Sequence, residues 1–247
     1  YSTDMTAAVS TLLIAHLKLT VTSGSAVGYQ RLVRLDNHSV ATSGLTVPTD
    51  RERLLLPYVL SDADDETRLC LVNTTQDAKT LGLTLDTGNT TTTALAANAT
   101  AAFSIASLFG NQPQSEAHAG AIAQAEGVVG TLVLQRGSSV SAVPLANTTS
   151  TQLSFPHLAQ DDVWWTSMTF YNPGAQEATI DFALYSAQGT NLGGSAQVSV
   201  PAGGSRVTTP LSLGFPSDVA WASAQASQPV AGLLVFGSKD LASLDGY

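Results

Sequence analysis

Three glycines recur at one interval along this chain. Gly28, Gly130 and Gly232 stand 102 residues apart, and two small apolar residues precede each of them. A long fixed period is the signature of a repeated structural unit, so most of the chain must fold as copies of one unit. The sequence of 247 residues then holds two complete units of about 100 residues and one partial unit at the N-terminus.

A second set of landmarks aligns the two complete units. Pro57 and Pro156 each follow an apolar residue, and Asn73 and Asn172 each end a strand-like run. Both pairs are 99 residues apart, and an acidic loop lies between the proline and the asparagine in each unit. One offset shared by two landmarks indicates that the two units follow the same structural plan.

Alternating apolar residues predict the strands. In residues 179–185, Ile180, Phe182 and Leu184 fall on one face, and leucines alternate in the same way in residues 80–85. A period of two is typical of a half-buried strand. Each unit is predicted to hold about seven short strands with turns roughly every 8 to 12 residues, which is typical of an Ig-like sandwich.

The predicted fold class is therefore all-β, with tandem Ig-like antiparallel β-sandwiches in two complete copies and one partial N-terminal copy. We expect the C-terminal half of a unit over residues 1–50 and complete sandwiches over residues 51–149 and 150–247. A half-sandwich exposes an apolar face and unpaired strand edges, so it must be completed. Preceding residues, strands of another subunit, or packing on the neighbouring sandwich would each complete it.

The composition restricts the partners. Only 12% of the residues are charged, and the formal net charge is −9. An acidic surface repels phosphate backbones, which argues against nucleic acid as a partner. A surface of neutral polar residues suits an extracellular or cell-surface protein, so we expect the chain to be secreted. No apolar run approaches the ~20 residues of a membrane span, and the expected partners are other copies of the chain or neighbouring repeats.

The acidic loop of the first complete unit is the best candidate for a metal site. Calcium favours several hard oxygen ligands from a flexible loop. The candidate ligands are Asp62, Asp64, Asp65 and Glu66. Their spacing is not that of an EF-hand, because the required glycine and the distal glutamate are missing. The alternative is a solvated loop that carries charge, and no other cofactor is expected.

Two adjacent tryptophans are the best candidate for a ligand platform. Trp164 and Trp165 follow Asp161 and Asp162, and exposed aromatic rings beside carboxylates can stack on sugars. A period of two sends the two rings to opposite faces of a strand, so at least one of them is expected in a core. Packing in the core and at an interface is therefore the alternative interpretation.

The sequence carries no catalytic motif. The four histidines are scattered, and none of them pair at metal-ligand spacing. A Gly-x-Ser-x-Gly nucleophile elbow is also missing. A Ser-His-Asp site assembles in space, so spacing alone leaves that arrangement open. The single cysteine, Cys70, lies in an apolar strand-like run and is expected in the core. We predict that the protein is not an enzyme.

The last unit contains a series of short motifs: Phe155-Pro156-His157, Trp164-Trp165-Thr166, Tyr171-Asn172-Pro173, Pro201-Ala202-Gly203-Gly204-Ser205 and Pro229-Val230-Ala231-Gly232. This series resembles an uncharacterised family of bacterial secreted and cell-surface proteins built from tandem Ig-like β-sandwich repeats. The preceding unit departs from this pattern at Tyr58, at Glu66-Thr67 and at Thr74. The resemblance implies a surface-exposed array of sandwiches and implies no substrate.

The expected function is that of a non-enzymatic structural or adhesive extracellular protein. In its sharper form this hypothesis predicts a filament subunit that is completed by strand exchange between subunits. The alternative is a carbohydrate-binding or other ligand-binding module of a larger secreted protein. The repeat and the low charge favour the first hypothesis, whereas the adjacent tryptophans and aspartates favour the second.

Overall fold

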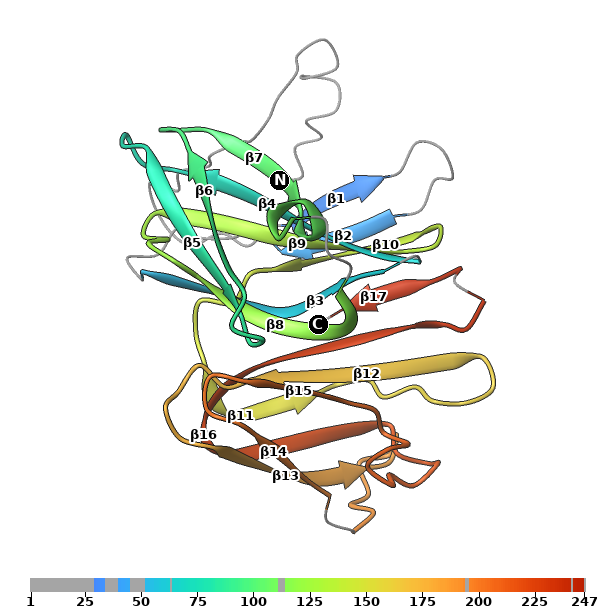
Figure 1. Cartoon of the computed structure of the whole chain (residues 1–247). Helices are drawn as coiled ribbons and strands as arrows, with labels where there is room; N and C mark the ends of the chain where they lie inside the picture. Colours follow the sequence, from blue (N-terminus) through green and yellow to red (C-terminus); the bar gives the residue numbers. More distant parts are fainter. Residues whose placement is uncertain are drawn as a thin grey trace, which may run out of the picture.

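The computed structural model describes residues 29–33, 40–44, 52–62, 64–110, 114–193, 196–240 and 242–246. Within these ranges the regular structure is almost entirely β-strand, and every strand pair is antiparallel (Figure 1). The one helix in the described ranges is the single turn α2 (Ile105–Leu108). The predicted all-β class is confirmed.

The first half of the chain forms two four-stranded sheets. Its strands are β3 (Arg53–Ser61), β4 (Asp65–Asn73), β5 (Lys79–Leu85), β6 (Thr90–Leu95), β7 (Thr100–Ser104), β8 (Gln114–Ala123), β9 (Val128–Arg136) and β10 (Ser139–Pro144). One sheet has the order β3-β8-β5-β6, and the other has the order β10-β9-β4-β7. An apolar core joins them, with Leu81 and Leu83 from the first sheet and Leu69 and Leu71 from the second. These leucines are fully buried, as the alternation of apolar residues predicted.

The second half also forms two layers. Its strands are β11 (Ser150–Phe155), β12 (Trp164–Tyr171), β13 (Ala178–Tyr185), β14 (Gln197–Val200), β15 (Ser205–Thr208), β16 (Trp221–Ser238) and β17 (Leu244–Gly246). The long strand β16 belongs to both layers, because residues 221–226 pair with β13 and residues 231–238 pair with β12. The apolar core of this half includes Phe170, Ile180 and Phe182.

The two halves have the same strand order. In the first half β8 lies between β3 and β5, and in the second half β16 lies between β11 and β13. In the other layer β9 lies between β10 and β4, and β16 lies between β17 and β12. The two strands β8 and β9 thus occupy the place that the single strand β16 occupies in the second half.

This order differs from that of an immunoglobulin domain. In an immunoglobulin domain the first strand pairs with the second, and the second pairs with the fifth. Here the second and fifth strands of the first half, β4 and β7, are paired, but the first strand, β3, pairs with β8. The first strand therefore lies in the layer opposite to the one that it would occupy in an immunoglobulin domain.

The landmark asparagines make the same hydrogen bonds in both halves. The Asn73 Nδ2 donates to the Asp77 carbonyl oxygen at 2.7 Å, and the Asn172 Nδ2 donates to the Gln176 carbonyl oxygen at 2.7 Å. Each Oδ1 accepts the N–H of the residue two positions later at 3.0 Å. Both side chains are fully buried. A buried amide is stable only when its polar atoms are bonded, so these asparagines lock the turn that follows β4 and β12.

A buried threonine forms a second shared bond. The Thr67 Oγ1 donates to the Leu60 carbonyl oxygen at 2.7 Å and accepts the Leu60 N–H at 3.0 Å. The Thr166 Oγ1 makes the same two bonds to Ala159, at 2.6 Å and 3.0 Å. In both halves the hydroxyl thus ties the start of the second strand to the chain that precedes the acidic loop.

The two halves pack against each other through an apolar interface. Leu233 and Val235 of β16 belong to the core cluster of the first half, and Trp165 packs against the same cluster. A smaller cluster joins Leu55 of β3 to Tyr171 of β12. In Figure 1 the layer of β12 and β16 accordingly lies next to the layer of β3 and β8. The halves therefore share a continuous apolar contact.

Only a hairpin of the predicted partial unit lies within the described residues. It consists of β1 (Tyr29–Val33) and β2 (Val40–Gly44). Ala41 is buried in a cluster with Val140 and Ala142 of β10, so the hairpin packs on the neighbouring sheet. Gly28 and the rest of residues 1–50 outside the hairpin lie beyond the described residues, and the proposed boundaries of this unit stay a prediction.

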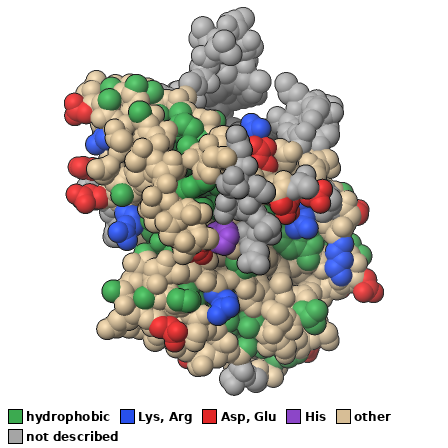
Figure 2. Space-filling view, in the orientation of Figure 1, with side chains coloured by type: hydrophobic (Ala, Val, Ile, Leu, Met, Phe, Trp, Pro, Cys, Tyr) green, Lys and Arg blue, Asp and Glu red, His purple; other side chains and the backbone are tan. Residues whose placement is uncertain are grey.

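The surface has few charges. On the face in Figure 2, red and blue side chains are scattered over a mostly tan surface of neutral side chains and backbone. Within the described ranges, no helix has the length and apolar character that crossing a membrane requires.

The recurring glycines give a test of packing. A Cβ at Gly130 would lie 2.6 Å from the Leu145 Cδ1 and 2.7 Å from the Leu71 Cδ2, whereas the nearest atom to a Cβ at Gly232 would be the Leu153 Cδ1, at 3.0 Å. We expect Gly130→Ala to lower the free energy of unfolding by about 1–3 kcal/mol, because it overpacks the core. Gly232→Ala should have a smaller effect. Gly82→Ala, with no atom within 4 Å, is the control. Urea unfolding of the three variants measures how much free energy of unfolding each one loses. Equal losses in Gly130→Ala and Gly82→Ala would contradict the prediction.

Replacing a landmark asparagine should destabilise the fold. Asn172→Ala removes the donor of the bond to the Gln176 carbonyl and leaves that carbonyl and the Gly174 N–H without this partner. We expect a loss of about 2–3 kcal/mol in the free energy of unfolding. Gln176→Ala is the matched control, because it keeps the carbonyl and removes only an exposed side chain. A loss of less than about 0.5 kcal/mol in Asn172→Ala, within the range of surface substitutions, would refute the structural role.

Candidate functional site

The acidic loop after β3 is closed by its first aspartate. The Asp62 Oδ1 accepts the N–H of Asp64 at 2.8 Å and the N–H of Asp65 at 2.9 Å. The Asp65 carboxylate lies 3.8 Å from the Arg136 Nε. Burial raises the pKa of Asp65, and the Arg136 guanidinium opposes that change. Two of the four predicted calcium ligands are thus occupied in holding the loop and in pairing with a cation.

The predicted calcium ligands do not converge. The Glu66 Oε1 lies 3.0 Å from the Arg68 Nε, so this carboxylate has a cationic partner on its own strand. In the described part of the chain, no three His, Cys, Asp or Glu side chains are grouped so that they could hold a metal ion. The arrangement of these side chains gives the calcium hypothesis no geometric support, and the site stays a prediction.

The loop before β12 is built in the same way. The Asp161 Oδ1 accepts the N–H of Val163 and the N–H of Trp164, each at 2.7 Å. The bonds from Trp164 and Val163, together with the charge of Lys239, lower the pKa of Asp161. Asp162 is exposed. The carboxylate of Asp161 therefore stays ionised in neutral solution, and it fixes the backbone at the first residue of β12.

The adjacent tryptophans lie on opposite sides of β12, as their alternation predicted. Trp165 packs toward the first half of the chain: Arg136 lies 4.8 Å from the centre of its ring, and its Nε1 donates to the Ser238 carbonyl oxygen at 3.3 Å. Trp164 lies near Phe236, at the other side of the strand. One tryptophan thus serves the interface between the halves, and the other lines a groove.

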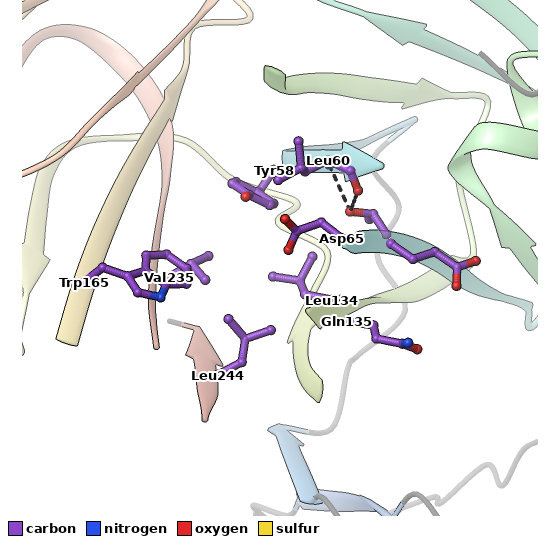
Figure 3. A pocket seen from close by; sticks show the side chains of 10 residues that line it. Tyr58, Leu60, Asp65, Leu134, Gln135, Trp165, Val235 and Leu244 are labelled. Carbon is purple, nitrogen blue, oxygen red and sulfur yellow. Dashed lines mark hydrogen bonds between the residues drawn. The ribbon is translucent and has the colours of Figure 1, made fainter. Parts of the chain in front are cut away.

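The space beside Trp165 is too small for a ligand. Figure 3 shows Tyr58 and Asp65 of the first half facing Trp165 and Val235 of the second. The cavity between them has a volume of about 10 Å³, which is room for one water molecule at most. Burial raises the pKa of the Tyr58 hydroxyl far above its ordinary value. These side chains therefore act as interface packing.

The groove beside Trp164 is much larger. It has a volume of about 590 Å³ and lies between two loops of the second half, residues 156–163 and residues 209–220. The Leu211 N–H donates to the Gln160 Oε1 at 3.1 Å, and the Leu158 N–H donates to the Ala220 carbonyl oxygen at 2.8 Å. The two loops are therefore tied to each other, and the groove is pre-formed.

Most residues that line this groove are aromatic or apolar, and polar atoms also form a large part of its surface. The ring of Phe236 lies 6.5 Å from that of Trp164 and 4.9 Å from that of His157, measured between centroids. Leu211, which is 75% exposed, lies on one side, and Val163, 56% exposed, precedes Trp164. The polar side chains of the lining are those of His157, Gln160, Asp161 and Ser217. The volume of the groove falls within the range of small-molecule sites.

A polar cluster between the halves was not predicted from the sequence. The Asp86 carboxylate accepts a hydrogen bond from the Ser205 hydroxyl, and the His118 Nδ1 lies 3.0 Å from the Asp86 Oδ1. Asp86 lies between the other two side chains, so the serine is not bonded to the histidine as a nucleophile must be to its base. The cluster therefore lacks the geometry of a catalytic triad. No motif connects these three positions, and only the packing of the halves brings them together.

A stacked aromatic pair was also missed. The rings of Tyr185 and Trp221 lie 3.9 Å apart with an angle of 7° between them. The two residues are direct partners on β13 and β16. Strand pairing alone produces this contact, because 36 residues separate the two positions.

Cys70 is half-buried, and burial raises the pKa of its thiol, which disfavours the reactive thiolate.

No protein-family model matches the chain, and a search of curated proteins found no match. The function is therefore inferred from the geometry and the residue pattern.

The Asp86 cluster should stabilise the contact between the halves. We expect Asp86→Ala to lower the free energy of unfolding by about 2–3 kcal/mol, because it leaves the Ser205 hydroxyl without its acceptor and removes the carboxylate that lies 3.0 Å from the His118 Nδ1. Ser205→Ala should have an effect of about 1 kcal/mol. The exposed Asp77→Ala is the control. A double-mutant cycle by thermal unfolding measures the interaction energy between Asp86 and Ser205. If the effects of Asp86→Ala and Ser205→Ala were additive, this interaction would contribute nothing to stability.

Proposed function

We propose that this chain is a non-enzymatic structural or adhesive protein of the extracellular space or cell surface. Its units are tandem Ig-like sandwiches over residues 51–149 and 150–247, with a partial unit over residues 1–50. The proposal rests on one observation above all: two halves with the same strand order pack directly against each other through an apolar interface. Such nearest-neighbour packing is how repeat proteins build extended scaffolds.

The roles of the shared motif residues support a scaffold. The asparagine, the threonine and the first aspartate of each acidic loop all bond to the backbone of their own half. A catalytic motif would instead direct its polar atoms into a cleft. The repeated residues therefore preserve the fold of each unit, in agreement with a family of structural repeats.

The connection between the halves supports a rigid array. The chain passes from β10 to β11 in five residues, and Leu145 within this segment is buried in the core of the first half. The Leu55 N–H donates to the Ala146 carbonyl oxygen at 2.7 Å, which fixes the same segment. A short and bonded linker of this kind holds neighbouring units at a constant orientation, as a structural array requires.

The sheet edges support assembly between copies. Strands β6 and β14 each end the order of a sheet, with one neighbour among the described strands. Residues 90–93 of β6 are four threonines, which are compatible with strand pairing. An edge strand offers its backbone N–H and C=O groups to a strand of another molecule, and contacts of that type that do not close produce filaments.

Assembly of the purified full chain tests this proposal. We expect mass to increase with concentration in light scattering, and elongated particles in electron microscopy. Thr92→Lys places a charge on the edge strand β6 and should reduce assembly if this edge is used. Thr84→Lys, an exposed position on the inner strand β5, is the matched control. A chain that stays monomeric at every concentration would refute the filament form, and turnover of any substrate would refute the non-enzymatic assignment.

A further inference from the structure

We propose that the groove between residues 156–163 and 209–220 binds a neutral oligosaccharide. This binding site is independent of the scaffold role and adds a ligand to the surface of the second half. The proposal rests on the shape of the groove, on its aromatic lining, and on the polar groups fixed beside the aromatic rings.

The aromatic lining supplies a platform for sugar rings. Trp164 is the first residue of β12, and its N–H donates to the Asp161 Oδ1, so its backbone is held at the mouth of the groove. Phe236 packs near it at 6.5 Å, and His157 packs on Phe236 at 4.9 Å. The C–H face of a pyranose packs well on an aromatic surface, and large rigid rings contribute contact area with little loss of entropy.

Polar side chains stand beside this platform. Asp161 lies in the lining, is exposed, and is ionised because the bonds from Trp164 and Val163 lower its pKa. Gln160 is held by the bond that its Oε1 accepts from the Leu211 N–H, which leaves the orientation of its amide defined. Carboxylate and amide groups fixed next to an apolar surface are suited to the hydroxyl groups of a sugar, which alternate with its C–H faces.

The charge of the groove selects a neutral ligand. Among the described residues that line it, one is an aspartate and none is lysine or arginine. Lys239 lies nearby but does not line the groove, and its Nζ donates to the carbonyl oxygen of Asp161 in the loop of residues 156–163, at 2.6 Å. With a formal net charge of −9 on the whole chain, phosphorylated, sulfated and uronic-acid ligands are repelled.

The size of the groove fits a short oligosaccharide. Its volume of about 590 Å³ falls inside the range of roughly 300–1,000 Å³ that is typical of small-molecule sites. The exposed Leu211 in the lining raises a second possibility, an apolar peptide or a second copy of the chain. The fixed Asp161 and Gln160 favour the sugar, because an apolar partner would have to desolvate an ionised carboxylate.

Titration of the full chain with defined sugars tests the site. The probes are the neutral hexaoses of cellulose, chitin, xylan, mannan and starch, with an oligogalacturonate and a sulfated oligosaccharide as anionic comparisons. Calorimetry and tryptophan fluorescence should detect at least one neutral hexaose and neither anionic sugar. Trp164→Ala should weaken the binding about tenfold or more, as expected for loss of a central aromatic contact.

Two further variants make the result decisive. Trp221→Phe, which alters the pair with Tyr185 outside the groove, should bind as the parent does. Asp161→Asn keeps an oxygen acceptor for the loop, so its circular dichroism spectrum should match that of the parent. It should nevertheless weaken sugar binding. This variant keeps the proposal testable if Trp164→Ala fails to fold. The proposal would be overturned if the chain bound none of the neutral hexaoses or preferred an anionic sugar. Unchanged sugar binding in both Trp164→Ala and Asp161→Asn would also overturn it. Dimerisation abolished by Leu211→Ser, without sugar binding, would assign the groove to a second copy instead.

Discussion

Strand β16 buries both of its faces where the two halves of the chain meet. Leu234 points into the core of the second half, whereas Leu233 and Val235 belong to the core cluster of the first. A strand covered on both sides becomes a continuous apolar run, and residues 230–235 have that character. The relative position of the halves depends on this contact, as do the small cavity beside Trp165 and the meeting of Asp86 with Ser205.

The same contact gives two neighbouring tryptophans different roles. Strand β12 pairs with β16 along the boundary, so alternate side chains of β12 face the first half or the core of the second. Trp165 lies at the boundary beside Arg136, and Trp164 lies at the groove of the second half. The structural hypothesis and the ligand-binding hypothesis thus concern opposite faces of one strand and are compatible with each other.

Much of the fold was predictable, because a strand with one buried face shows an alternation of apolar and polar residues in the local sequence. The alternation around Ile180 and the shared offset of Asn73 and Asn172 correctly indicated strands and equivalent turns. The candidate sites were harder to predict. The acidic residues after β3 suggested calcium ligands, yet Asp62 closes its turn and Asp65 lies near Arg136. The far wall of the groove, residues 209–220, carries no motif, so nothing in the sequence connected it with Trp164.

The sequence alone establishes an all-β chain with two equivalent stretches, since the period of two and the recurring landmarks reflect bonds made within a few residues or within one unit. It also places Asp161 and Asp162 close before the tryptophan pair, with Val163 between them. The tertiary structure decides that the first strand joins the opposite layer, that Asp86 reaches Ser205, and that Trp164 lines a groove. The physical reason is that alternation records only that one face of a strand is buried. Which neighbour covers that face depends on packing between residues about a hundred positions apart.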